Sequence, residues 1–232
     1  MNLTTLNEAY GEPYVLAVGG LLVGLMFGFF AQRSKFCLRA AVVEFWHRQF
    51  GEKLSVWLLT FSAAVIAIQG LIVLGSLDVS TARQIASRGS LSGALIGGLL
   101  FGAGMIMTRG CASRLLILSA NGNLRALLSG LIFAVTAQSA LSGALSPLRE
   151  ALTGLWTIEG GDSRDLLAIL GWSHTTGLIV GGVWLLAALY FTTRTTQRAW
   201  MWIGGIGTGL SVATAWWFSY SVSKASFEVV HI

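Results

Sequence analysis

Charged residues are scarce in this chain. Of its 232 residues only 11% are Asp, Glu, Lys or Arg, whereas 54% are hydrophobic. A soluble domain carries about 25% charged residues, so the composition excludes a mainly soluble protein and leaves no polar surplus for a separate soluble domain. A mean hydropathy of +0.72 indicates an integral membrane protein.

Proline and cysteine are also rare, with two residues of each. Few prolines allow long helices to run unbroken, and two cysteines do not make a disulfide framework. The three histidines, His47, His174 and His231, are scattered and give no metal-ligand spacing with the cysteines. We therefore expect no metal site, no cofactor and no enzyme activity.

Blocks of basic residues are missing as well. The net charge is +5, but the 15 Lys and Arg residues are spread over the joints between apolar runs. Proteins that bind nucleic acid gather such residues in patches, so we exclude nucleic acid as a partner. The 9 Trp and 29 Gly residues instead fit a chain surrounded by the lipid bilayer.

Apolar runs of helical length fill most of the sequence, and they predict an all-α membrane protein with a single membrane domain over residues 1–232. Pro13 is placed to open the first run. Most runs approach the roughly 20 residues that a spanning helix needs, but two Gly-rich runs are shorter. The expected spans are 54–74, 124–141, 174–191 and 200–220, the shorter Gly-rich runs 14–31 and 91–107, the short helices 36–50 and 111–120, and the turn Asn121-Gly122-Asn123.

A motif that occurs twice gives the sharpest signal. GLLVGLMFGFFAQRSKFCLR at 20–39 and ALIGGLLFGAGMIMTRGCASR at 94–114 both end a Gly-rich apolar run in polar residues and a cysteine. A shift of 74 residues aligns them without a gap: Gly24 falls on Gly98, Leu25 on Leu99, Phe27 on Phe101, Gly28 on Gly102, Ser34 on Thr108, Lys35 on Arg109 and Cys37 on Cys111. We infer an internal repeat with copies at about 14–75 and 91–142, followed by the spans 174–191 and 200–220.

Two arrangements of the copies are open. If each Gly-rich run crosses the membrane, the copies are parallel, and the Lys and Arg counts of the connecting segments mildly favour this. If each run and its following short helix form a re-entrant pair, the copies are inverted and the two cysteines face each other near the membrane centre. Short runs and many glycines favour the inverted arrangement, which resembles how many transporters build a central site.

The surroundings of the two cysteines suit an anion. Each lies in the first turn of a short helix, where unpaired N–H groups and the positive dipole end attract anions, and Ser34 is placed to be the N-cap of the first helix. A thiol is a soft, weak S–H donor, so a sulfur-bearing anion is the natural match. The candidate pathway residues are Cys37, Cys111, Lys35, Arg109, Ser34, Thr108, Gly110, Arg39 and Arg114.

Structural readings of the same residues stay open. A membrane cysteine is often a small packing residue, the two cysteines could form a disulfide, and basic residues also anchor helices at the headgroups. Four Gly-x-x-x-Gly spacings predict close helix packing. They are Gly24/Gly28, Gly98/Gly102, Gly177/Gly181 and Gly205/Gly209.

The stretches GLMFGFFAQRSKFCLRAA and FGAGMIMTRGCASRLL resemble the cysteine motifs of the YeeE/YedE sulfur-transport family, which includes bacterial thiosulfate importers. The resemblance implies an inner-membrane protein with an hourglass shape, in which Cys37 and Cys111 relay thiosulfate or a related anion by S–H contacts. Family members usually run longer and carry a third functional cysteine, which this chain lacks. Three explanations are open: the chain is a fragment of a longer protein, another chain completes the route, or the short members of the family work differently. A second membrane chain or a small cytoplasmic sulfur-carrier protein is a candidate partner.

Three other functions compete with thiosulfate transport. Related family members are linked with selenium metabolism, so the transported compound could contain selenium. A membrane sulfurtransferase or redox protein could instead carry a persulfide on one cysteine, because nearby basic residues lower a thiol pKa. The chain could also be an assembly subunit whose cysteines only pack.

Overall fold

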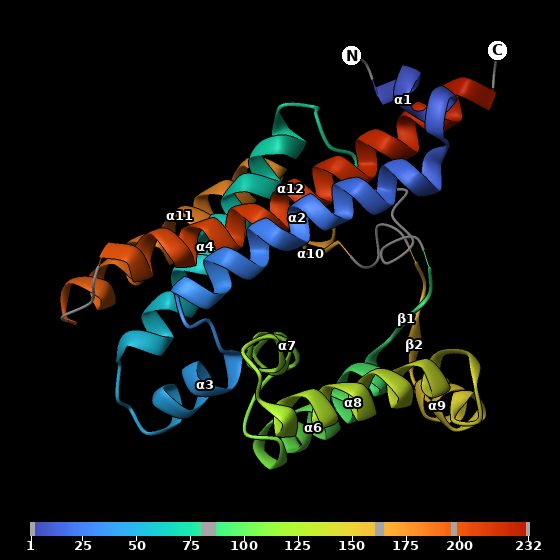
Figure 1. Cartoon of the computed structure of the whole chain (residues 1–232). Coiled ribbons are helices and arrows are strands. Elements are labelled where there is room, and N and C mark those ends of the chain that lie inside the picture. The colour runs from blue at the N-terminus through green and yellow to red at the C-terminus, as the bar shows by residue number, and fades with distance from the viewer. Residues whose placement is uncertain (1–2, 80–86, 161–164, 196–198, 231–232) are drawn as a thin grey trace. The chain divides into compact units, whose positions relative to one another are not determined.

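The computed structural model describes residues 3–79, 87–160, 165–195 and 199–230, and these are almost entirely helical (Figure 1). His231, considered above as a metal ligand, lies outside the described residues. Contacts divide the chain into two units. The first comprises Met1–Phe36, Phe50–Val79 and Trp172–Ile232, and the second comprises Cys37–Gln49 and Ser80–Gly171.

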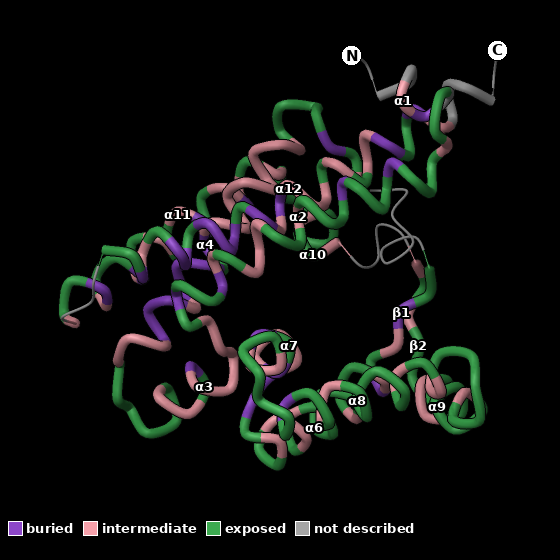
Figure 2. The backbone as a smooth tube through the Cα atoms, viewed as in Figure 1, coloured by how far each residue is buried: buried purple, intermediate pink, exposed green. Residues whose placement is uncertain are grey.

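Four long helices form the first unit: α2 (Glu12–Arg33), α4 (Glu52–Val73), α11 (His174–Thr193) and α12 (Ala199–Val230), with the short α1 (Leu3–Tyr10) beside α12. Pro13 occupies the first turn of α2, as predicted. α4 packs against both α11 and α12, and α12 also packs against α2. Figure 2 shows the buried residues gathered along these helices, and the largest fully buried side chains are those of Leu59, Val56 and Val222.

Gly-x-x-x-Gly spacings let α11 and α12 approach α4, as predicted for two of the four pairs. A Cβ on Gly181 would lie 2.8 Å from a side-chain carbon of Ile66. A Cβ on Gly209 would collide with the backbone carbonyl of Thr60. Small residues at these positions bring helix backbones into contact, which in a membrane replaces the hydrophobic driving force between helices.

A polar pair joins α4 to α11 inside the same unit. His174 Nδ1 lies 3.0 Å from Gln69 Oε1, next to the close approach of Gly177 to the Gln69 side chain. Gln69 is therefore an interhelical hydrogen-bonding group in this structure.

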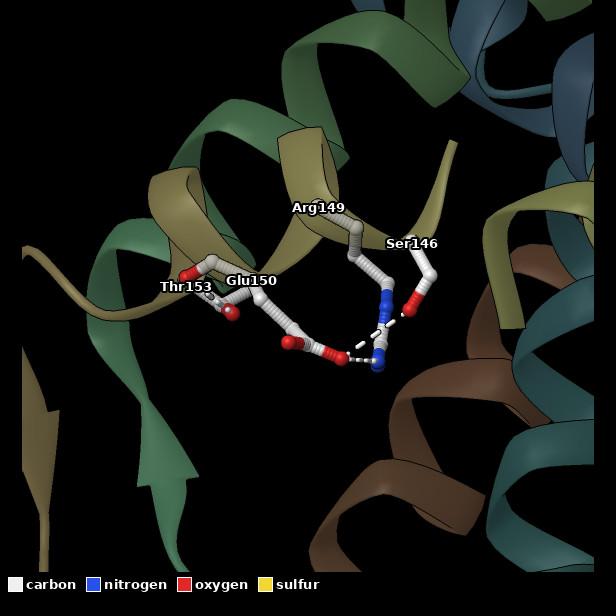
Figure 3. Close-up of polar contacts among 4 residues, drawn as sticks. All are labelled: Ser146, Arg149, Glu150 and Thr153. Atoms are coloured by element: carbon white, nitrogen blue, oxygen red, sulfur yellow. Dashed lines mark hydrogen bonds and ion pairs between the residues drawn. The ribbon is translucent and has the colours of Figure 1, made fainter. Parts of the chain in front are cut away.

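The second unit holds α3 (Leu38–Trp46), α6 (Leu91–Met107), α7 (Ala112–Ala120), α8 (Leu124–Ser142), α9 (Ser146–Thr153) and α10 (Leu166–Ile169). A two-stranded antiparallel pair, β1 (Gly89–Ser90) with β2 (Thr157–Ile158), was not predicted. The Ser90 and Ser92 hydroxyls donate to carbonyls at the end of α9 and fix the start of α6 there. On α9 itself, Glu150 accepts from Ser146 and pairs with Arg149, as Figure 3 shows.

The first Gly-rich run forms a longer helix than predicted. α2 has 22 residues, about 33 Å at 1.5 Å per residue, which exceeds the roughly 30 Å hydrocarbon core. α6 has the predicted 17 residues and is about 26 Å long. The short-run argument for a re-entrant pair therefore applies to the second copy and not to the first.

Within the part of the chain that the structure describes, five segments are long and apolar enough to cross a membrane by length and composition: Glu12–Trp46, Glu52–Val73, Leu91–Ala120, Leu124–Ser142 and His174–Thr193. The expected run 200–220 lies within the single helix α12. The protein is thus an all-α, multi-pass membrane protein, as its composition predicted. The repeat bounds and the inverted arrangement stay predictions.

The two Gly-x-x-x-Gly pairs in the repeated motif make no close helix contact among the described residues, so close packing at these pairs stays a prediction. An added Cβ on any of the four glycines, Gly24, Gly28, Gly98 or Gly102, would meet nothing within 4 Å. The aligned leucines beside them, Leu25 and Leu99, are 62% and 69% exposed. Gly24 nevertheless lines a pocket between α2 and α12, so α12 lies opposite this glycine without the close approach seen at Gly181.

Candidate functional site

The helix ends that precede the two cysteines have the same backbone. Ser34 ends α2 and Thr108 ends α6, both in the right-handed helical region, with φ of −78° and −81°. Each hydroxyl donates to the carbonyl four residues earlier, at 2.9 Å from Ser34 Oγ to Phe30 O and 2.8 Å from Thr108 Oγ1 to Gly104 O. These bonds cap the helix ends with side chains that the repeat had aligned.

Ser34 was predicted to be the N-cap of the following helix, and this is wrong. Ser34 is fully buried and is the C-cap residue of α2. Its hydroxyl donates to Phe30 O of that helix and not to an amide of the following one. The N-cap residue of α3 is Cys37.

Lys35 and Arg109 then turn the chain in the left-handed region, with φ of +54° and +58°. Lys35 N–H donates to Gln32 O and Phe36 N–H to Ala31 O, the two bonds of a Schellman motif. Glycine is the usual residue at this position. Arg48 adopts the same conformation at the end of α3, so the conformation alone does not single out the repeated motif.

Cys37 and Cys111 are the N-cap residues of α3 and α7, and both have extended backbone. Each helix is nine residues long. The predicted short helices are confirmed, although the first is shorter than the expected 36–50. At an N-cap the side chain lies beside the first-turn N–H groups, which have no partner within the helix.

The two thiols meet. Both cysteines are free, both belong to the second unit, and their side chains lie close enough to interact with each other. Cys111 is 4% exposed, while Cys37 is partly exposed. Residues that are 74 positions apart in the sequence thus form one thiol pair.

Backbone amides converge on this pair from both helices. The amides of Ala40 and Cys111 interact with the Cys37 sulfur, and those of Arg114 and Leu38 interact with the Cys111 sulfur. Neither cysteine makes a regular side-chain cap. The N-terminal ends of α3 and α7 therefore present N–H groups to a shared place, as an anion site requires.

The other candidate pathway residues, which flank the cysteines in the sequence, are divided between the two units. Arg39 and Arg114 lie in the first turns of α3 and α7, and Gly110 is buried immediately before Cys111. Thr108 and Arg109 belong to the same unit, whereas Ser34 and Lys35 belong to the first unit and are tied to Cys37 by the chain itself.

Several basic side chains lie beside the two cysteines. Among the described residues, no carboxylate forms an ion pair with Lys35, Arg39, Arg109 or Arg114. The Nε atom of Arg39 is buried and has no hydrogen-bond partner among the described residues. A buried, unpaired guanidinium nitrogen costs free energy unless an anion or water satisfies it.

Ser113 is a site residue that the sequence reasoning missed. Its hydroxyl oxygen lies 3.3 Å from the sulfur of Cys111. The repeat could have indicated this residue, because a shift of 74 residues aligns Ser113 with Arg39, which is a candidate pathway residue. The described residues hold no cluster of three His, Cys, Asp or Glu side chains that could bind a metal ion.

Comparison with known proteins bears on this site. The sequence model of the family described as sulphur transport matches residues 33–231. The thiosulfate transporter TsuA of Spirochaeta thermophila is 26% identical over 193 residues, which are 77% of this chain and 55% of that protein. The chain thus spans about half the length of this curated relative. Because the family match covers most of its length and both cysteines, the chain belongs to the sulphur transport family.

Proposed function

We propose that this chain forms a route for thiosulfate, or a closely related sulfur anion, across a bacterial inner membrane. Membership of the sulphur transport family and the name of the thiosulfate-transporting relative support the substrate class. One structural observation carries the proposal, namely that two thiols meet where the N-terminal ends of two short helices converge.

The proposed binding mode matches each end of the anion to different groups. The oxygens of thiosulfate accept hydrogen bonds from first-turn amides and from the unpartnered Nε of Arg39. Its terminal sulfur, which is soft and polarizable, contacts the thiols of Cys37 and Cys111 through S–H donors. No covalent bond forms, so the anion can leave as it entered.

The backbone conformation of two basic residues supports a role for their side chains. Lys35 and Arg109 occupy left-handed conformations that glycine adopts at lower cost. We infer that their positive charges draw the anion toward the cysteines. The inverted arrangement of the copies belongs to this proposal, as does a second membrane chain or a sulfur-carrier protein that completes the route.

Growth on thiosulfate tests the proposal. The full chain is produced in a bacterium that lacks its own sulfate and thiosulfate importers, with its candidate partner gene where one is found beside it, and thiosulfate is the sole sulfur source. We expect Cys37→Ala and Cys111→Ala each to abolish growth at equal levels of membrane-inserted protein. Normal growth of both variants would overturn the proposal.

Mass spectrometry separates transport from sulfur transfer. In the enzyme alternative, a thiolate attacks the outer sulfur of thiosulfate, the S–S bond breaks, and sulfite leaves while the cysteine becomes a persulfide. We expect both cysteine peptides to keep their unmodified mass after incubation with thiosulfate. One added sulfur on either peptide, with release of sulfite, would support the sulfurtransferase instead.

A further inference from the structure

The turn that precedes Cys37 rests directly on the backbone of α12. Ser34, at the end of α2, is fully buried, and its hydroxyl donates to Phe30 O. A Cβ built on Gly204 of α12 would lie 2.9 Å from both the Cβ and the backbone N of Ser34, and 3.0 Å from Phe30 O. Two of these three atoms belong to the main chain, so a side chain at 204 could not be accommodated by a rotamer change.

A second glycine of α12 continues the same contact. A Cβ on Gly207 would lie 2.5 Å from the Phe30 ring. Gly204 and Gly207 are one helical turn apart, so they form a single side-chain-free surface on α12. Phe30 and Ser34 of α2, four residues apart, lie on that surface and fix the last turn of the helix.

The consequence for the site follows from the chain path. Hydrogen bonds from Lys35 N–H and Phe36 N–H back to α2 continue the rigid turn from Ser34 to Phe36, and Cys37 is the next residue. A shift of the Ser34 backbone is therefore passed along a short, hydrogen-bonded segment to the thiol. The turn before the second cysteine belongs to the other unit, in which α6 packs mainly on α9 and β2.

We propose that Gly204 is a positioning residue, which fixes the turn directly before Cys37 by letting the α12 backbone contact the end of α2. This inference rests on the proposed function only for its link to uptake, since the reactivity of the Cys37 thiol can be measured without transport. It assigns to α12 a role in fixing the turn that leads into Cys37.

Differential alkylation of the two cysteines tests the proposal. The full chain in membranes is treated with N-ethylmaleimide for short times, and the labelling rates of the Cys37 and Cys111 peptides are compared by mass spectrometry. In Gly204→Ala we expect the ratio of the two rates to change at least threefold, with a comparable loss of thiosulfate uptake per inserted molecule.

Gly209→Ala is the matched control. Gly209 lies on the same helix and is packed at least as tightly against backbone, but its neighbours are Thr60 and Ala63 of α4. We expect this variant to lower thermal stability and to leave the labelling ratio within twofold of the original. Should Gly204→Ala fail to insert, Phe30→Leu loosens the neighbouring contact of the Phe30 ring with Gly207 without added bulk, and it carries the same expected change in ratio.

The possible outcomes are distinct. An unchanged labelling ratio in whichever of Gly204→Ala and Phe30→Leu folds overturns the positioning role. An equal change in Gly209→Ala also overturns it, because general loosening would then explain the effect. A changed ratio with unaltered uptake retains the positioning role and counts against the proposed function instead.

Discussion

At the scale of single residues, the two basic residues that precede the cysteines have a left-handed backbone, which glycine adopts at a lower cost in free energy. Lys35 and Arg109 follow helix ends of the same geometry and turn the chain with positive φ. A left-handed conformation costs an L-residue about 1 kcal/mol relative to glycine. Strained positions of this kind cluster at functional sites, and the repeat places these two at equivalent points before the cysteines.

Replacing these residues by glycine should therefore separate stability from function. We expect Lys35→Gly and Arg109→Gly each to raise the free energy of unfolding by about 1 kcal/mol. Lost attraction for the anion should lower uptake about tenfold, the effect of removing one charged hydrogen bond. Thermal unfolding in detergent and uptake of radiolabelled thiosulfate measure the two quantities.

Arg48→Gly is the control for both variants. Arg48 has the same left-handed backbone but lies at the far end of α3 from Cys37. It should gain similar stability and keep full uptake. Equal uptake losses in all three glycine variants would show that the positions beside the cysteines are not special.

Arg39 gives a prediction about ligand binding. Its buried, unpartnered Nε should be satisfied when an anion binds, so thiosulfate at 100 times its dissociation constant should stabilise the protein by about 2.7 kcal/mol. In Arg39→Met we expect this ligand-dependent rise in melting temperature to disappear, while the melting temperature without ligand is unchanged or higher. A full thiosulfate response in Arg39→Met would exclude this residue from the site, and sulfate serves as the comparison anion.

At the scale of helices, sequence reasoning predicted the elements well and their contacts less well. The run 91–107 forms α6 with the predicted bounds, because apolar length and the break at Thr108 are local signals. The Gly-x-x-x-Gly spacing is a local signal too, but its meaning depends on which helix lies opposite. Gly181 has α4 opposite and Gly98 has open space, and nothing in either spacing distinguishes them.

The site shows the same division. The repeat predicted both cysteines as equivalent residues at the starts of short helices, and the structure places them there. Ser34 was misassigned because a serine before a helix and a serine after one look alike in sequence, and the bond to Phe30 decides between them. Contacts such as that of Gly204 with Ser34 depend on tertiary packing and leave no local trace.

Alanine substitution should distinguish the two kinds of glycine. Gly181→Ala adds a Cβ within 2.8 Å of Ile66, and overpacking of this kind costs about 1–3 kcal/mol. Gly98→Ala meets nothing within 4 Å and should stabilise α6 by up to about 1 kcal/mol through helix propensity. Melting temperatures of the two variants should therefore move in opposite directions, and a large loss in Gly98→Ala would show that its face contacts protein.

At the scale of the whole molecule, the thiol pair joins two segments that lie 74 positions apart in the sequence. Cys37 follows α2 and Cys111 follows α6, so their contact determines how the starts of α3 and α7 lie against each other. The chain spans about half the length of the curated relative it matches. Nevertheless, the paired cysteines and their helix ends are formed by this chain alone.

Oxidation of the pair should report on the bound anion. Diamide takes up the two thiol hydrogens and is reduced to the hydrazide, while the sulfurs of Cys37 and Cys111 join in an intramolecular disulfide. Because the two thiols lie close enough to interact, we expect rapid crosslinking without ligand, measured as a joined pair of peptides after proteolysis. Thiosulfate between the sulfurs should slow this crosslinking at least fivefold, whereas sulfate, which lacks the soft terminal sulfur, should slow it less. Oxidation of glutathione under the same conditions controls for direct reaction of thiosulfate with diamide, and equal crosslinking rates with and without thiosulfate would place the anion away from the two thiols.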